Sequence, residues 1–274
     1  MFLPASFEQK YGRTEPRFIS STGVRELKSR RGKETLKREE DAFGQLLLAC
    51  YEENEAVEII ERDDGLISVY DPRVYFSDHK HWPVFEREAM RFVKGRVLDI
   101  GCGAGRHALY LQRKGFDVLG IDKSLLAIEI CKLRGLRKAK VMSVEDAWFR
   151  RDRFDTIIMM GNNFGLLGGF RKARRLLKRF HRMTSKDAVI VAETRDPYKT
   201  EKRVHLEYHR LNRRRRRMAG QVRIRIRFEK CATGWSDYLF VSKDEMKEIL
   251  RGTGWKIRQF IDSKNSQYVA IIGK

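Results

Sequence analysis

From Arg96 onward the chain alternates short apolar segments with amphipathic ones, and this alternation limits the possible fold more than any other feature. The candidate strands RVLDI, DVLGID, AKVMSV, FDTIIMM and AVIVAET are separated by candidate helices. After an interruption the pattern resumes with the helix SKDEMKEILRGTGW and the strands KIRQFID and QYVAIIGK. Short apolar strands joined by helices predict a mostly parallel sheet that is covered on both faces. The sequence therefore predicts an α/β fold.

The other segments surround this alternation. The stretch DAFGQLLLACYEEN has the pattern of a helix, VEIIERDDGLISVY that of a hairpin turning at Asp64-Gly65, and PVFEREAMRFV that of a second helix. These observations predict four parts, which are a basic N-terminal extension over 1–40, a helix and hairpin cap over 41–95, an α/β domain over 96–195 and 242–274, and a basic, β-rich insertion over 196–241.

A glycine loop follows the first of these strands. In VLDIGCGAGRHALYL, Gly101, Gly103 and Gly105 lie between a strand and a helix, and Asp99 precedes them. Glycines permit a tight turn and a close approach of the backbone to a ligand, while a carboxylate suits an ammonium group and is a poor neighbour for a pyrophosphate. Asp122 ends the second strand, where a carboxylate can hold both hydroxyls of a ribose. The alternative is an NAD-binding or non-catalytic nucleotide-binding unit.

This run resembles the class I S-adenosylmethionine-dependent methyltransferases over roughly 96–195 and 242–274. The resemblance implies a Rossmann-like, seven-stranded, mostly parallel sheet whose last strand is antiparallel, and S-adenosylmethionine as the cofactor. It implies that Asp99 and the three glycines surround the methionine part of the cofactor and that Asp122 holds its ribose. Asp146, in SVEDAW after the third strand, matches the acidic position that contacts the adenine amine.

The loop after the fourth strand, MMGNNFGLLGG, occupies the position that faces the methyl group in this family. Gly161-Asn162-Asn163-Phe164 resembles loosely the motif of enzymes that methylate exocyclic base amines, although it lacks the prolines. A carbonyl of Asn162 or Asn163 can accept a hydrogen bond from such an amine, and Phe164 can stack on a flipped base. The alternative is a simple tight turn. Neither GNNFGL nor ETRDPY, at the ends of the fourth and fifth strands, contains a cysteine, which argues against methylation of pyrimidine carbon 5.

Positive charge is concentrated in the insertion. The chain carries a net charge of +21, and over 201–230 Lys and Arg outnumber Asp and Glu by 12 to 3. In QVRIRIRF arginines alternate with apolar residues, which predicts a strand with one apolar face and one basic face. Arginine matches phosphate oxygens bidentately, so the sequence predicts an RNA-binding surface. It comprises Arg213, Arg214, Arg215, Arg216, Arg217, Arg223, Arg225 and Arg227. The basic helix FRKARRLLKRFHRM adds a second such element.

These features together predict an RNA methyltransferase. The insertion resembles a group of archaeal and bacterial methyltransferases, and the resemblance points to ribosomal RNA cytidine-N4 methylation. A small-molecule or lipid methyltransferase and a non-catalytic RNA-binding protein are the alternatives. The four scattered cysteines and the lack of a signal peptide or an apolar span predict a cytoplasmic protein without membrane attachment. His205 and His209 lack a third ligand, so no metal is expected. Many Lys, Arg and Glu residues are compatible with a thermophilic source.

Overall fold

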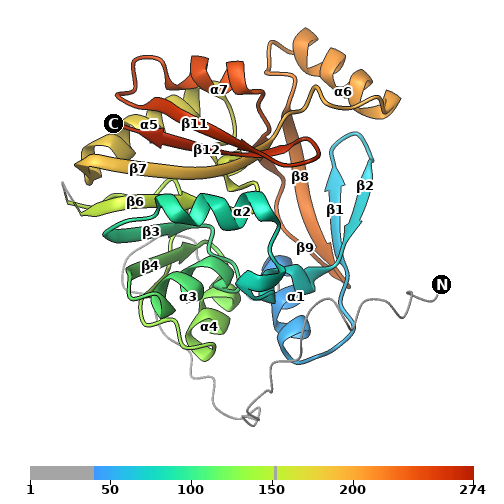
Figure 1. Cartoon of the computed structure of the whole chain (residues 1–274). Helices are drawn as coiled ribbons and strands as arrows, with labels where there is room; N and C mark the ends of the chain where they lie inside the picture. Colours follow the sequence, from blue (N-terminus) through green and yellow to red (C-terminus); the bar gives the residue numbers. More distant parts are fainter. Residues whose placement is uncertain (1–39, 151–152) are drawn as a thin grey trace. The chain divides into compact units, whose positions relative to one another are not determined.

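A seven-stranded sheet forms the centre of the computed structural model, which describes residues 40–150 and 153–274 (Figure 1). The strand order is β11-β12-β7-β6-β3-β4-β5. Strands β3 to β7 are parallel, whereas β12 is antiparallel to both of its neighbours. The predicted strands and the antiparallel last strand are confirmed. Their bounds are β3 (Arg96–Ile100), β4 (Asp117–Asp122), β5 (Ala139–Val141), β6 (Phe154–Met159), β7 (Thr184–Arg195), β11 (Lys256–Asp262) and β12 (Gln267–Gly273).

Helices cover both faces of this sheet because alternate side chains of each strand point to opposite faces. Val97 packs with residues of α2, α3 and α4 on one face, and Leu98 packs with residues of α5 and α7 on the other. The helices are α2 (Val84–Ala89), α3 (Arg106–Arg113), α4 (Leu125–Leu133), α5 (Phe170–Met183) and α7 (Lys243–Leu250). Short 3₁₀ segments occur at η2 (Pro72–Phe76), η3 (His79–His81), η4 (Met90–Phe92) and η5 (Asn163–Leu167). The predicted three-layer α/β domain is therefore confirmed.

A second sheet lies beyond the carboxyl ends of the parallel strands, on the right in Figure 1. Its order is β10-β8-β1-β2, and β9 pairs with β8. The bounds are β1 (Glu58–Arg62), β2 (Ile67–Tyr70), β8 (Gln221–Phe228), β9 (Cys231–Ala232) and β10 (Ser236–Leu239). The predicted hairpin and the predicted arginine strand are both present, but β1 and β8 pair directly with each other. One sheet thus combines strands from the segments 41–95 and 196–241.

Two further helices flank the second sheet. Helix α1 (Ala42–Tyr51) begins at Asp41, whose Oδ1 accepts a hydrogen bond from the Gly44 N–H at 2.9 Å. The other oxygen of Asp41 accepts from the Ser124 hydroxyl at 2.7 Å, which fastens α1 to the start of α4. Helix α6 (Arg203–Arg214) lies in the insertion, ahead of the strands β8, β9 and β10.

The predicted extension over 1–40 lies outside the described residues except for its last residue. Among the residues that are described, no helix is long and apolar enough to cross a membrane.

Candidate active site

The glycine loop takes a backbone conformation that side chains disfavour. Gly101, Gly103 and Gly105 have φ angles of +73°, +52° and +81°. A Cβ atom on Gly101 would lie 2.6 Å from Nδ2 of Asn163, so this position is restricted by space as well. At Gly103 the nearest atom to such a Cβ is Cζ of Phe43, at 3.7 Å. The backbone at Gly103 is therefore open enough for a ligand to approach it, with Phe43 of α1 beside it.

Two buried carboxyl groups lie at this loop. Asp99 is 2% exposed and its Oδ2 has no hydrogen-bond partner, and Asp122 is 8% exposed. Burial, together with the nearby charge of Asp122, raises the pKa of Asp99 to about 8. Burial also raises the pKa of Asp122, although hydrogen bonds from Ser124 and Gly103 lower it. No cationic side chain forms an ion pair with either carboxyl within the described part of the chain. Such a pair of uncompensated acids favours a cationic ligand.

Asp122 also links the loop to the second strand of the domain. Its Oδ2 accepts from the Gly103 N–H and its Oδ1 from the Ser124 N–H, both at 3.0 Å. Each carboxylate oxygen has two lone pairs, so both oxygens can accept further hydrogen bonds from the hydroxyls of a ribose. Asp146 follows β5 and is exposed, and its carboxyl accepts from the Ser143 hydroxyl at 3.0 Å. The adenine contact of Asp146 remains a prediction.

The loop after β6 is tied to the glycine loop. Nδ2 of Asn163 donates to the carbonyl oxygens of Ile100 and Gly101, at 3.1 and 2.8 Å. Asn162 has a φ of +65°, and its buried Oδ1 has no hydrogen-bond partner. The amide of Asn163 therefore holds the two loops together, whereas the side-chain carbonyl of Asn162 has no donor.

The stacking role predicted for Phe164 does not fit this structure. The side chain is fully buried in the core between the sheet and helices α5 and α7. A ring with no exposed face cannot stack on a base, so Phe164 contributes to packing instead.

Two residues that the sequence did not single out shape this loop. The hydroxyl of Tyr238, on β10, donates to the carbonyl oxygen of Asn162 at 2.6 Å, and a Cβ on Gly165 would lie 2.0 Å from its ring. Glu193, on β7, accepts from the Gly161 N–H at 2.7 Å, and burial raises its pKa to about 8. Tyr238 lies in the predicted basic insertion, and nothing in the sequence around it indicates a contact with the loop after β6.

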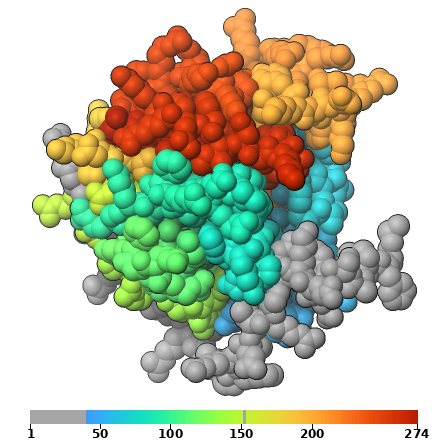
Figure 2. Space-filling view, in the orientation of Figure 1, coloured from blue at the N-terminus to red at the C-terminus, as the bar shows by residue number. Residues whose placement is uncertain are grey.

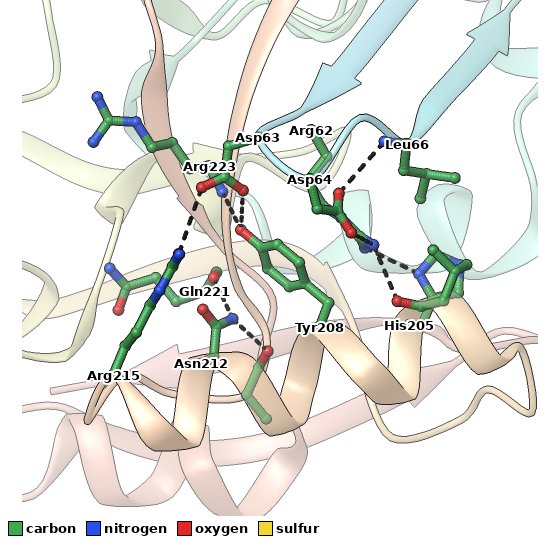
Figure 3. Close-up of polar contacts among 12 residues, drawn as sticks. Arg62, Asp63, Asp64, Leu66, His205, Tyr208, Asn212, Arg215, Gln221 and Arg223 are labelled. Atoms are coloured by element: carbon green, nitrogen blue, oxygen red, sulfur yellow. Dashed lines mark hydrogen bonds and ion pairs between the residues drawn. The ribbon is translucent and has the colours of Figure 1, made fainter.

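A polar network fastens α6 to the turn of the β1-β2 hairpin (Figure 3). Arg62 is 7% exposed and donates to both oxygens of Asp64, each at 2.7 Å. Its Nη1 lies 3.1 Å from Nδ1 of His205, and its guanidinium lies over the Tyr208 ring. The hydroxyl of Tyr208 donates to Asp63 at 2.5 Å. His205 thus belongs to a structural network, and no group of three metal-binding side chains occurs among the residues described.

The predicted arginine run lies at the carboxyl end of α6 and in the turn that follows it. Cations are favoured there by the helix dipole. Arg213 to Arg216 are exposed, and Arg215 lies 3.8 Å from Asp63. In the space-filling view this orange segment lies on the surface beside the cyan hairpin (Figure 2). Arg217 is half-buried, with an unpartnered Nη1.

The arginines of β8, predicted to bind RNA, are partly neutralised by a carboxylate of the neighbouring strand. Glu61 of β1 pairs with Arg225 at 2.9 Å and with Arg227 at 3.3 Å. The Arg225 guanidinium also lies over the Trp235 ring at 4.7 Å. Arg223 is exposed and points away from the network in Figure 3. Cross-strand pairing placed Glu61 beside these arginines, and the sequence alone did not reveal that pairing.

The fold is shared with solved methyltransferases. A S-adenosylmethionine-dependent methyltransferase from Bacteroides fragilis, solved in complex with S-adenosyl-L-homocysteine, matches with a TM-score of 0.75 and 24% identity. The match covers 87% of this chain and 97% of that one, so it includes much more than the central sheet. A methyltransferase from Methanosarcina mazei matches with a TM-score of 0.55, 18% identity, and coverage of 70% and 97%.

Curated relatives match over shorter stretches. The glycine/sarcosine N-methyltransferase of Halorhodospira halochloris is 26% identical over 141 residues, which is 48% of this chain and 53% of that protein. The tRNA (uracil(54)-C(5))-methyltransferase of Pyrococcus horikoshii is 32% identical over 114 residues, which is 39% of this chain and 28% of that protein. The chain thus spans about half or less of the length of these relatives.

The cofactor follows from these comparisons and from the site. S-adenosylmethionine is the cofactor of this fold, and its ammonium and sulfonium charges suit the uncompensated carboxyls of Asp99 and Asp122. When bound, it supplies an activated methyl group. Residues 78–259, which are 182 of 274, match the family described as methyltransferase domain. The chain therefore belongs to this family, and it is a class I S-adenosylmethionine-dependent methyltransferase.

Proposed function

We propose that this enzyme methylates an exocyclic amine of a base in RNA, with cytidine N4 of ribosomal RNA as the favoured acceptor. The observation that carries the RNA assignment is a set of exposed arginines that form no ion pair in the described part of the chain. Arg214, Arg216 and Arg223 are exposed, and no ion pair to any of them occurs among the described residues. Exposed arginines that form no ion pair can attract phosphate groups.

The acceptor chemistry is supported by Asn162. Its buried Oδ1 lacks a donor and lies in the loop that faces the methyl group in this family. An exocyclic amine offers the N–H that this oxygen lacks. Carbon acceptors are less well supported, because attack on pyrimidine carbon 6 requires a thiolate. Cys102 lies in the glycine loop, where the hydrogen bond with Cys131 and burial hold its pKa well above its usual value.

A small amine is the second candidate acceptor. The match to glycine/sarcosine N-methyltransferases favours it, and so does the neutralisation of Arg225 and Arg227 by Glu61. A small acceptor needs no phosphate-binding surface. The two candidates therefore differ in whether the arginines matter for turnover.

The test uses purified protein, radiolabelled S-adenosylmethionine and total RNA from a strain that lacks the gene. We expect label in RNA, and digestion to nucleosides with mass spectrometry identifies the methylated base. Parallel reactions contain glycine or sarcosine in place of RNA. Label in these amines and none in RNA would replace the RNA proposal with the small-amine one.

Replacing Arg223, Arg225 and Arg227 by Gln tests the surface. Two of these arginines share one carboxylate, so the triple substitution removes about two uncompensated charges. We expect weaker RNA binding and a salt slope smaller by about 1.4–1.8, at 0.7–0.9 per phosphate contact. The matched control replaces Lys132, Arg137 and Lys140, three exposed cations near the β5 edge, and should leave the slope unchanged. Equal slopes for both triple variants would contradict the proposal.

A further inference from the structure

The second sheet has an inner face that points toward the active site. Residues opposite each other in an antiparallel pair lie on the same face. The register pairs Ile60 with Ile226, Tyr238 with Val222, and Glu58 with Tyr70. Glu58 and Tyr238 therefore lie on one face, while Glu61 and the three arginines lie on the other. The bond from Tyr238 to the Asn162 carbonyl shows that the inner face meets the loop after β6.

Glu58 is a buried acid without a cationic partner. Its exposed fraction is 3%, and both of its carboxyl oxygens accept from the Tyr75 hydroxyl, at 3.1 and 3.0 Å. No ion pair to Glu58 is found within the described ranges. Burial raises its pKa to about 7, although the Tyr75 hydrogen bond lowers it. A buried carboxyl of this kind destabilises the fold unless a ligand compensates it.

Tyr75 connects Glu58 to the predicted cofactor site. Its ring meets that of Phe43 edge to face at 5.4 Å, and Phe43 lies beside Gly103. Burial and the charge of Glu58 raise the pKa of Tyr75 well above its usual value, and Tyr238 and Asp122 raise it further. Asp122 belongs to the predicted ribose site, and the hydroxyl of Tyr238 donates to the loop after β6, so the Glu58–Tyr75 pair lies near both.

We propose that Glu58, oriented by Tyr75, binds the acceptor nitrogen opposite the methyl donor and takes the proton that this nitrogen releases. This inference rests on the proposed function only in that the acceptor is a nitrogen. The nitrogen lone pair forms the bond to the methyl carbon while the carbon–sulfur bond breaks and its electron pair stays on sulfur. The methylated nitrogen then loses one proton, which passes to a carboxylate oxygen of Glu58.

The inner face also limits the shape of the acceptor. Ile60, Ile224 and Ile226 are half-buried rather than fully packed, and they share the face that carries Glu58. They offer an apolar surface beside an acidic group. This combination suits a planar or apolar group that carries its nitrogen at one edge, as a nucleobase does.

Sinefungin tests this placement without knowledge of the acceptor. This cofactor analogue carries an amine where the methyl group would be, so its ammonium occupies the position that Glu58 should face. Calorimetry on the full chain measures its affinity relative to S-adenosyl-L-homocysteine. For Glu58→Gln we expect the sinefungin affinity to fall at least tenfold, with the S-adenosyl-L-homocysteine affinity within about twofold of wild type. Tyr75→Phe should give a smaller loss of the same kind.

The matched control is Glu61→Gln, because Glu61 lies on the same strand and points to the outer face. It should leave the affinity ratio unchanged. A Glu58→Gln variant that binds S-adenosyl-L-homocysteine normally and keeps the wild-type ratio would overturn the proposal. If Glu58→Gln does not fold, the ratio in Tyr75→Phe decides in the same way. Glu58→Gln could lower the sinefungin affinity relative to that for S-adenosyl-L-homocysteine while the wild-type enzyme methylates no RNA. That result would refute the RNA proposal and support the role of Glu58.

Discussion

Replacing Asp99 by asparagine should have opposite effects on the stability of the free protein and on its affinity for the cofactor product. The folded pKa of about 8 lies above the ordinary value of 3.8. Between these values the folded protein keeps a proton that the unfolded chain has released, so stability falls as pH rises. Each pH unit costs about 1.4 kcal/mol, and at pH 7 the accumulated loss is at most about 4 kcal/mol.

Asparagine does not titrate, so the variant should avoid this loss. The asparagine side chain would, however, bury an amide N–H group without an acceptor, which costs about 1–3 kcal/mol. The net gain at pH 7 is therefore about 1–3 kcal/mol in the free protein. Urea unfolding at pH 5, 6 and 7 measures it, and the wild type should lose about 1.4 kcal/mol per unit relative to the variant.

The affinity for S-adenosyl-L-homocysteine should move in the opposite direction. Binding of the ligand's ammonium group favours the ionised carboxylate of Asp99, which asparagine cannot provide, so we expect at least tenfold weaker binding, which is about 1.4 kcal/mol. Calorimetry at pH 7 measures this change. Parallel stability curves for wild type and variant between pH 5 and 7 would refute the reasoning, because they would show that folding does not raise the pKa of Asp99 in the free protein.

Two other substitutions probe neighbouring features. Asp122→Ala should weaken cofactor binding at least tenfold, since it removes the predicted ribose acceptor and the bond to the Gly103 N–H, and unchanged affinity in calorimetry would contradict that role. Gly165→Ala should destabilise the protein by about 1–3 kcal/mol, because the new Cβ would lie 2.0 Å from a ring whose hydroxyl is held by Asn162. Thermal unfolding measures the second effect, and Gly234→Ala is its control, with open space around the new Cβ.

The central sheet could be predicted because its signals are local. Each strand is a short apolar run, and the glycine loop follows its strand directly, so periodicity and spacing were sufficient. The hairpin at Asp64-Gly65 was predictable for the same reason.

The second sheet and the acceptor side could not be predicted in this way. The pairing of β1 with β8 depends on two segments that the sequence shows far apart, and it decides that Glu61 lies beside Arg225. The burial of Phe164 and the contact of Tyr238 with Asn162 likewise depend on tertiary packing. The sequence predicts that Asn162 lies in the loop, but only the structure distinguishes its unpartnered side-chain carbonyl from the side-chain amide of Asn163, which donates to the glycine loop.

The pairing of β1 with β8 has a consequence for how the chain folds. Ile60 and Ile226 are cross-strand partners although they are 166 positions apart in the sequence. Closing such a loop lowers the chain entropy before the contacts between the strands can offset that loss. Strand pairs of this separation therefore form late unless the intervening chain is already compact. The central sheet, whose neighbouring strands are mostly close in sequence, can fold first and bring the two segments together. Substitutions in the β1–β8 pair should then accelerate unfolding and leave the refolding rate nearly unchanged.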